Sequence, residues 1–223
     1  MPLKTFTPTP SITELIDLLS LELQKKLPGE KAHNIMAPSI RNYALKKADP
    51  SKARKSGVLL LLYPREEQLN IGLIRRSTGG HNHSGQMSFP GGKYELSDTS
   101  LIHTALRETQ EELGIPIEQV KVLGCLTHLF IPVSNFHVAP VVGILPHPPE
   151  VIPNPFEVDQ FVEIPLNVLF HPNNISNQEI IKNGYRIQTP YYNALGNKVW
   201  GATAMILSEL HQVCSQSGLI SFS

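Results

Sequence analysis

Apolar residues follow two different spacings along the chain, one typical of helices and the other of strands. Between residues 11 and 27 they recur every three or four positions, which predicts one amphipathic helix. Ser11 and Glu14 have the spacing of a capping box, and a Pro-Gly pair ends the run. We expect this helix to pack on the domain that follows it. Residues 29–55 are mixed and basic, and we expect irregular structure there with a short helix.

The clearest strand pattern is the continuous apolar run at residues 56–63, which suits a buried strand. A polar turn leads to residues 69–76, its expected antiparallel partner. Helical spacing returns at residues 99–113, and Gly114 followed by a nearby proline is typical of a helix end. The remaining expected elements are strands at 120–131 and 137–145, a strand and helical turn at 161–170, a hairpin of 185–194 with 197–200, and a helix at 202–214.

Strands and helices alternate without internal repeats, and this order sets the expected fold. It favours an α/β or α+β sandwich over a helical bundle or an all-β barrel. We expect residues 1–55 to form an N-terminal helical extension that packs on the core, and residues 56–223 to form the main domain. A chain of 223 residues is long enough for this division.

Composition and charge narrow the range of functions. Apolar residues make up 41% and charged residues 17% of the chain, as in an ordinary soluble protein with a substantial core. The formal net charge is zero, which gives no overall electrostatic case for binding nucleic acid or an anionic membrane. No apolar run reaches membrane-spanning length, and the N-terminus lacks the apolar segment of a signal peptide, so we expect a cytoplasmic protein. Two cysteines do not make a disulfide framework.

Three carboxylates stand close together near the end of the helix predicted at 99–113. At about 100° per residue, Glu108, Glu111 and Glu112 share one stripe, whereas the apolar residues fall on another side. A solvated helix face is one interpretation, because Glu is a good helix former. A divalent-cation site is the other, and the preceding FPGG favours it because adjacent glycines let the backbone approach a ligand. Mg²⁺ and Mn²⁺ take oxygen ligands of this kind.

The segment at 91–115 resembles the Nudix box, whose pattern is G-x5-E-x7-R-E-U-x-E-E-x-G-U with U aliphatic. Its second half matches in register from Arg107 onward, with Thr109 at a position that is usually aliphatic. In the first half, Gly92 lies one residue farther from Arg107 than the pattern has it, and Asp98 stands near the place of the first Glu. The resemblance implies a Nudix-like α/β/α sandwich with a mixed β-sheet and a loop-helix-loop catalytic motif.

An upstream signature narrows the resemblance to the coenzyme A pyrophosphatase branch of this family. GQMSFPGG at residues 85–92 fits the G-x3-F-P-G-G ending of the signature, and the longer first half of the box also resembles the branch. RRSTGGHNHSG fits the rest of the signature, except that His81 stands where arginine is usual. Downstream of the box, PNPFEVDQFVEIPLNVLF (residues 153–170) and VWGATAMIL (residues 199–207) also resemble the branch. The likeness therefore covers roughly residues 56–210.

This resemblance implies hydrolysis of coenzyme A or acyl-coenzyme A at the diphosphate, which gives 3′,5′-ADP and (acyl-)4′-phosphopantetheine. It implies Mg²⁺ or Mn²⁺ ions held by Glu108, Glu111, Glu112 and the Gly92 carbonyl. Such ions neutralise diphosphate oxygens and lower the pKa of a bound water. Arg107 would orient a glutamate through a charge-assisted pair, and it completes the expected catalytic set with the three glutamates.

Substrate contacts are expected on the glycine loop and on the strand beside it. Arg75 and Arg76 end a predicted strand and are expected, together with Gly91 and Gly92, to contact the substrate. The first-half acids Glu95 and Asp98 are expected to position the loop or cap the helix rather than to bind metal.

Several alternatives stay open at this point. A glutamate outside the box often completes such a site, and Glu157 and Glu163 are unranked candidates for the base. His81 and His83 have the spacing of a zinc-binding pair, and a glycine-rich gating loop is the other interpretation. The expected partner is a small nucleotide: the coenzyme A class, or alternatively ADP-ribose, NADH or a dinucleoside polyphosphate. A domain that senses a nucleotide without cutting it is the rival outside enzymes, and a homodimer also stays open.

Overall fold

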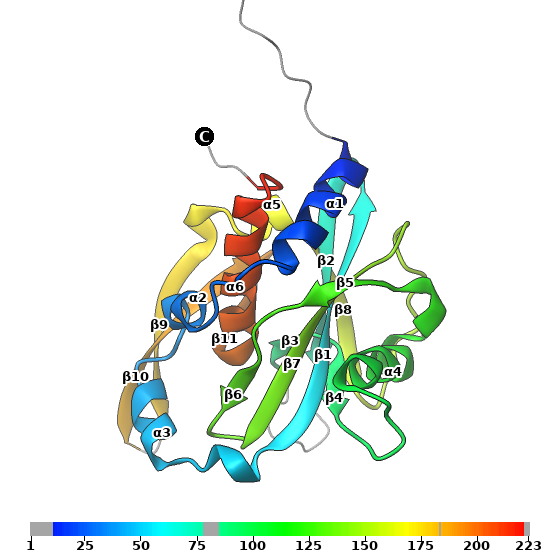
Figure 1. Cartoon of the computed structure of the whole chain (residues 1–223). Helices are drawn as coiled ribbons and strands as arrows, with labels where there is room; N and C mark the ends of the chain where they lie inside the picture. The colour runs from blue at the N-terminus through cyan, green and yellow to red at the C-terminus, as the bar shows by residue number, and fades with distance from the viewer. Residues whose placement is uncertain (1–10, 78–84, 183, 221–223) are drawn as a thin grey trace, which may run out of the picture.

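A computed structural model of the chain describes residues 11–77, 85–182 and 184–220 (Figure 1). Its strands form one large mixed sheet and one smaller sheet, and helices cover both faces of the large sheet. The predicted α+β class with a mixed sheet is therefore confirmed.

The large sheet contains eight strands among the described residues. They are β1 (Arg54–Arg65), β2 (Gln68–Arg76), β3 (Met87–Ser88), β4 (Gly91–Lys93), β5 (Lys121–Cys125), β6 (Leu129–Ile131), β7 (Phe136–Ile144) and β8 (Val158–Pro165). Their order is β3-β2-β1-β7-β5, with β4 beside β1, β6 beside β7 and β8 beside β2. The predicted hairpin of β1 and β2 is antiparallel, whereas β1 and β7 run parallel, and this makes the sheet mixed.

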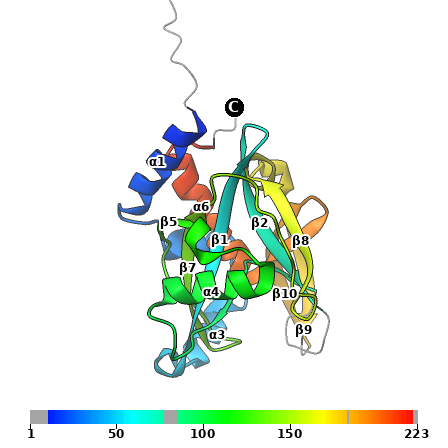
Figure 2. The ribbon, with the colours of Figure 1, turned by 90° about the vertical axis from the view of Figure 1, so that its right-hand side faces the viewer.

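Helices pack on both faces of the large sheet. One face is crossed by α4 (Leu101–Leu113), as Figure 2 shows, and the other is covered by α6 (Gly201–Gln216) together with α1 (Ile12–Leu23). Helix α2 (Glu30–Ile35) packs against α6. Side chains alternate along β1, so Leu59 and Leu61 pack toward α4 while Leu60 and Leu62 pack toward α6. Because both faces of β1 are buried, its sequence is a continuous apolar run rather than an alternating one.

Gly57 lets α4 lie directly on β1. A Cβ atom at this position would come within 3.0 Å of the Leu101 carbonyl oxygen and the Ala105 nitrogen, which are backbone atoms of α4. Every other residue type would force the helix away from the strand. This close contact sets the position of the carboxylates that α4 carries.

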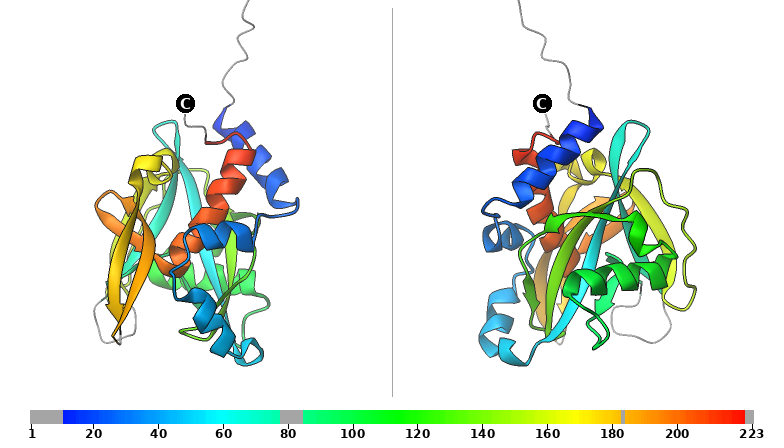
Figure 3. Two further views of the ribbon diagram at one scale, coloured as in Figure 1. Left: turned by 90° about the vertical axis from the view of Figure 1, so that its left-hand side faces the viewer. Right: turned by 45° about the vertical axis from the view of Figure 1, so that its right-hand side comes forward.

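The smaller sheet packs against the far side of α6. It consists of β9 (Ile175–Lys182), β10 (Tyr185–Ala194) and β11 (Asn197–Trp200), in the order β11-β10-β9. Figure 3 (left) shows α6 running between the two sheets. Tyr192 and Val199 of the smaller sheet are buried in the same core cluster as Leu60 and Leu210, so the two sheets and the helix share one core.

Several elements differ from the predicted ones, and the short strands β3 and β4 lie where only a glycine loop was expected. The strand predicted at 120–131 is two strands, β5 and β6, which pair with different parts of β7. The predicted short helix in 29–55 is joined by a second, α3 (Arg41–Lys47). Strand β9 was not predicted, because its sequence ISNQEIIK is too polar for a buried strand and its place at a sheet edge does not require burial. The predicted final helix and the hairpin of 185–194 with 197–200 are confirmed, but the helix extends a few residues farther to Gln216.

A buried carboxylate ties the N-terminal segment to the core. Glu209 of α6 is fully buried and accepts hydrogen bonds from the Gly29 backbone N–H at 2.8 Å and from the Thr127 N–H and hydroxyl at 3.1 and 2.7 Å. The His33 ring nitrogen Nε2 lies 3.0 Å from its second oxygen. These contacts satisfy the carboxylate, and they also explain the break between β5 and β6, where Thr127 turns toward Glu209.

Within the part of the chain that the structure describes, no helix is both long enough and apolar enough to cross a membrane.

Candidate active site

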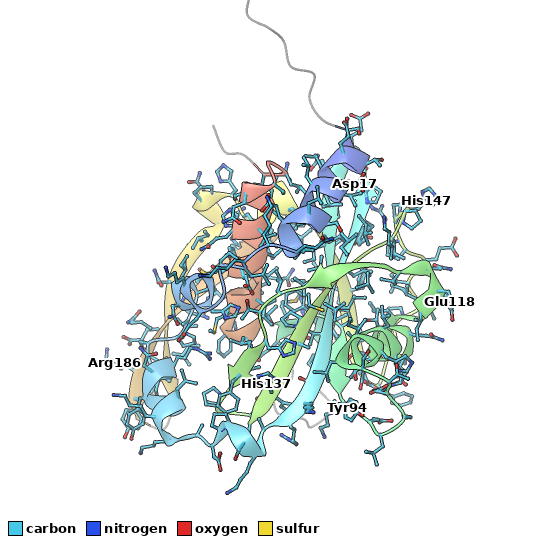
Figure 4. All side chains as sticks on the ribbon, viewed as in Figure 1. Asp17, Tyr94, Glu118, His137, His147 and Arg186 are labelled. Atoms are coloured by element: carbon cyan, nitrogen blue, oxygen red, sulfur yellow. The ribbon has the colours of Figure 1, made fainter. Side chains whose placement is uncertain are left out.

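Helix α4 carries Glu108, Glu111 and Glu112, referred to below as the box glutamates. Ser100 caps its N-terminus by accepting a hydrogen bond from the His103 backbone N–H at 3.1 Å. Gly114 has a left-handed φ of 71° and ends the helix, as predicted. The helix begins at Leu101 rather than at residue 99, because Ser100 is in extended backbone as a capping residue must be. Figure 4 labels Tyr94 and Glu118, which lie before and after α4 in the chain and on either side of it in this view.

Gly91 and Gly92 bring the β4 backbone against β1 and α4. Gly91 has a φ of 145°, and a Cβ there would come within 3.0 Å of the Gly57 carbonyl oxygen. A Cβ at Gly92 would come within 3.0 Å of the carboxylate carbon and both oxygens of Glu108. The glycine loop therefore leaves room for a carboxylate directly beside its backbone, which a side chain would fill.

Glu112 is the most buried of the box glutamates, with none of its surface exposed. Its carboxylate accepts a hydrogen bond from the Gly91 N–H at 2.8 Å and lies 3.4 Å from Arg76 Nη1. Burial raises the pKa of Glu112 to about 8, although the Gly91 hydrogen bond and the Arg76 charge lower it. In the absence of further positive charge, burial favours the protonated acid.

Arg107 is held in place by a buried carboxylate outside the box glutamates. Asp98 is only 4% exposed and accepts hydrogen bonds from Arg107 Nε at 2.9 Å and Nη2 at 3.1 Å, and from the Thr104 hydroxyl and the Glu95 N–H. The Arg107 contact and these other bonds lower the pKa of Asp98, against the effect of burial. Asp98 thus fixes both the loop before α4 and the guanidinium.

Arg107 in turn pairs with two of the box glutamates. Its guanidinium lies 3.2 Å from Glu108 and 3.0 Å from Glu111, and it donates to the Lys93 carbonyl at 3.1 Å. The side chain of Glu108 is 15% exposed, and that of Glu111 is 53% exposed. Burial raises the pKa of Glu108, and Arg107 opposes that rise. The carboxylates thus form a graded series from buried to exposed, across one face of the helix.

The two stripes predicted for α4 are not fully separate. Glu112, assigned to the charged stripe, is completely buried, and Ile102, assigned to the apolar stripe, is 38% exposed. The glycine loop covers the last turn of the helix, so Glu112 lies under it. Thr109 is buried as its place in the apolar stripe predicts, and its hydroxyl donates to the Ala105 carbonyl at 2.7 Å.

The two expected substrate-binding arginines lie on opposite faces of the large sheet. Arg76 faces α4 and contacts Glu112. Arg75 faces the smaller sheet, where it donates to the Asn197 side chain and lies 3.7 Å from Asp159. Successive residues of a strand point to opposite sides, so only one of the two arginines is brought to the box glutamates.

The two candidate bases, Glu157 and Glu163, lie at different distances from the box glutamates. The charge of Glu157 acts on Glu108 and Glu112 and raises the pKa of each, after the larger effect of burial. Glu163 accepts a hydrogen bond from Arg65 at 3.1 Å and pairs with Gly72, four residues before Arg76 on β2. At about 3.3 Å per residue this places it about 13 Å along the strand from Arg76. Glu157 is therefore the candidate that lies near the box glutamates.

Glu157 reaches this position through a loop that the sequence did not predict to contact α4. The backbone N–H groups of Ile152 and Asn154 donate to the carbonyls of Leu113 and Glu112, each at 2.9 Å. The side chain of Asn154 also lies 3.4 Å from Glu157. No apolar spacing marks this loop, but its proline-rich sequence PNPFEV begins one of the downstream segments that resemble the coenzyme A pyrophosphatase branch.

The donor set suits a hard divalent cation. Carboxylate oxygens of the box glutamates and backbone carbonyls of the glycine loop are the ligand types that Mg²⁺ and Mn²⁺ take. A cation beside Glu112 would favour its ionised form and offset the effect of burial. Among the described residues, no three acidic, histidine or cysteine side chains already stand in a metal-binding arrangement, since arginines and the Gly91 N–H hold the carboxylates. His81 and His83 lie outside the described residues.

Comparison with known proteins bears on the family of the chain. The NUDIX domain family matches residues 53–183, more than half of the chain. The protein named uncharacterized Nudix hydrolase NudL from Pectobacterium atrosepticum is 41% identical over 143 residues, which cover 62% of this chain and 71% of that protein. The protein of the same name from Yersinia pestis (strain Pestoides F) is 37% identical over 164 residues, covering 73% and 80%.

Solved structures with the same fold have much lower sequence identity. The Nudix hydrolase RenU from M. smegmatis has a TM-score of 0.52 at 16% identity, over 76% of this chain and 91% of that one. A MutT/nudix family protein from Enterococcus faecalis has a TM-score of 0.50 at 18% identity, over 93% and 76%. At such identities the likeness shows the fold alone.

Proposed function

Since the chain belongs to the Nudix hydrolase family, we propose that it cleaves the diphosphate of coenzyme A or acyl-coenzyme A in a reaction that depends on a divalent cation. The observation that carries the proposal is the contact of the glycine loop with the box glutamates. Gly91 donates to Glu112, and Gly92 leaves room for Glu108. The signature GQMSFPGG, which resembles the coenzyme A branch, forms this same loop.

The box glutamates and the Gly92 carbonyl would hold the cation, either Mg²⁺ or Mn²⁺. When bound, such an ion neutralises the diphosphate oxygens and lowers the pKa of a coordinated water. Arg107 keeps Glu108 and Glu111 in place through charge-assisted bonds, and Asp98 keeps Arg107 in place. Within the proposal, Arg107 is therefore a positioning residue.

The reaction adds one water across the P–O–P bond of the diphosphate. The water oxygen bonds to one phosphorus, the bridging oxygen leaves with the other phosphate, and a base takes the water proton. The products are 3′,5′-ADP and (acyl-)4′-phosphopantetheine. Glu157 is the proposed base, because its charge acts on Glu108 and Glu112 while Glu163 pairs with Arg65.

Substrate contacts are proposed on the same face of the sheet. Arg76 is the arginine that lies beside Glu112, so it is the better placed of the pair to contact the diphosphate. Arg75, on the other face, would contact a part of the substrate that extends past the end of β2. The backbone of Gly91 and Gly92 would lie against the phosphates.

A substrate panel tests the proposal. Purified protein is incubated with coenzyme A, acetyl-coenzyme A, ADP-ribose, NADH or diadenosine polyphosphates, with Mg²⁺ or Mn²⁺, and the products are identified by mass. Release of 3′,5′-ADP from the coenzyme A substrates well above the other rates is expected. Faster turnover of another nucleotide would identify that nucleotide as the substrate of the same reaction. If no substrate in the panel is turned over, a nucleotide sensor is favoured.

Four further predictions accompany this proposal. The family match begins at residue 53, which supports treating residues 1–55 as an extension of a domain at 56–223. A cytoplasmic location and a homodimer stay predictions, as does a small-molecule nucleotide partner in place of nucleic acid or membrane.

A further inference from the structure

The turn before β8 presents an exposed aromatic ring. Phe156 is 85% exposed, more than any other aromatic side chain in the described part of the chain. A phenyl ring left in water contributes almost nothing to the stability of the fold, so packing does not explain its presence here. Single exposed apolar residues are common, and the case for a role rests on how this one is held and where it lies.

The backbone under Phe156 is held firmly. Its N–H donates to the Asn154 side-chain oxygen at 3.1 Å, and its carbonyl accepts from the Ser77 hydroxyl at 2.6 Å. The next residue, Glu157, donates to the Asn154 carbonyl at 3.0 Å and accepts from the Ser77 N–H at 2.9 Å. Prolines on both sides of Asn154 fix two more backbone angles. A ring on such a turn loses little freedom when a ligand covers it.

This turn lies against the candidate active site. Asn154 donates from its backbone to the Glu112 carbonyl at 2.9 Å, and Ser77 directly follows Arg76, which contacts the Glu112 carboxylate. The side chain of Glu157, one residue from Phe156, acts on Glu112 through its charge. The exposed ring therefore stands at the edge of the place where the diphosphate is proposed to bind.

We propose that Phe156 is a specificity-determining residue that stacks against the base of a nucleoside diphosphate bound at the box glutamates. The base of a nucleotide is one sugar away from its first phosphate, so a ligand whose phosphates lie at the glutamates carries its base to the edge of the site. Every nucleobase has a flat face that stacks on an aromatic ring. The inference rests on one part of the proposed function, which is that the site binds a nucleoside diphosphate. It does not depend on which group is attached to that diphosphate.

Binding of ADP and of inorganic diphosphate, each with Mg²⁺, tests this role by isothermal titration. The two ligands share the diphosphate, and only ADP has a base. Phe156→Ala is expected to weaken ADP binding about 5- to 140-fold, which corresponds to the loss of one stacked base, and to leave diphosphate binding unchanged. Phe156→Tyr and Phe156→Trp should keep ADP affinity near that of the wild type.

Ile181→Ala provides the matched control, because this side chain is 69% exposed and lies on β9 of the smaller sheet. It should change neither affinity, and the melting temperature of every variant should stay at the wild-type value. The inference is overturned if Phe156→Ala binds ADP as tightly as the wild type, or if its affinities for ADP and for diphosphate fall equally. It is also overturned if the wild-type protein binds no ADP. The proposed function fails separately, when wild-type protein binds ADP but releases no 3′,5′-ADP from coenzyme A.

Discussion

Replacing Glu111 by glutamine tests the proposed cation site with little risk to the fold. The Glu111 side chain is 53% exposed, and its ion pair with Arg107 joins residues one helical turn apart. An exposed pair of this kind contributes about 0.3–0.5 kcal/mol to stability. A loss of that size lowers the melting temperature of a domain this large by about 1–2 °C. The fold of the variant should therefore be almost unchanged.

The expected effect on catalysis is much larger. A cation at a diphosphate contributes several kcal/mol of transition-state stabilisation, and its position depends on its carboxylate ligands. If Glu111→Gln removes about 3–4 kcal/mol of that contribution, kcat falls about 100- to 1,000-fold. Initial rates are measured by product release with Mg²⁺, on whichever substrate the panel identifies, and the melting temperature is measured by calorimetry on the same samples.

Glu118→Gln is the control for charge alone. Glu118 is exposed and lies beyond the C-terminal end of α4 (Figure 4), so its removal changes the net charge equally without touching the box glutamates. Its variant should turn over substrate at the wild-type rate. Near-wild-type turnover by folded Glu111→Gln would refute the cation-site assignment, and an equal loss in Glu118→Gln would attribute the effect to overall charge.

The remaining predictions concern residues that support the site or the fold. Asp98→Asn leaves the Arg107 guanidinium without its buried carboxylate. The free energy of unfolding measured in urea should therefore fall by about 3 kcal/mol, and the turnover rate should fall as well. An unchanged urea midpoint would contradict this prediction. Gly92→Ala places a methyl group against the flexible carboxylate of Glu108, so it should lower turnover at least about tenfold with little change in melting temperature. Gly57→Ala instead places its methyl group against the backbone of α4, so it should lower the melting temperature itself. Burial raises the pKa of Glu209, but its hydrogen bonds outweigh that effect, and the net pKa lies below the ordinary value of 4.5. Its contribution to stability is therefore complete above pH 4.5 and is lost as the pH falls through the lowered pKa, and Glu209→Gln should flatten the acid limb of a plot of melting temperature against pH.

Local patterns in the chain predicted most of the elements correctly. The capping box of α1 forms as its sequence indicates, with Ser11 and Glu14 bonding reciprocally. Gly114 ends α4 in left-handed backbone because a residue without a Cβ adopts that conformation at little cost. Such features depend on residues within a few positions of each other, so sequence spacing alone contains them. The polar edge strand β9 has no comparable local pattern, and its place beside β10 is set by long-range pairing.

The features of the candidate site likewise fall into those that local sequence patterns predict and those that depend on tertiary packing. That three glutamates and an arginine share one helix after a glycine loop follows from the amino-acid sequence, because helical spacing and the Nudix box are local properties. Tertiary packing alone decided that Glu112 is buried beneath Gly91, that Arg76 rather than Arg75 faces it, and that Glu157 rather than Glu163 lies near it. Burial, the side of the sheet that a residue faces and the charges around it depend on elements far apart in the chain, and no spacing within a segment encodes them.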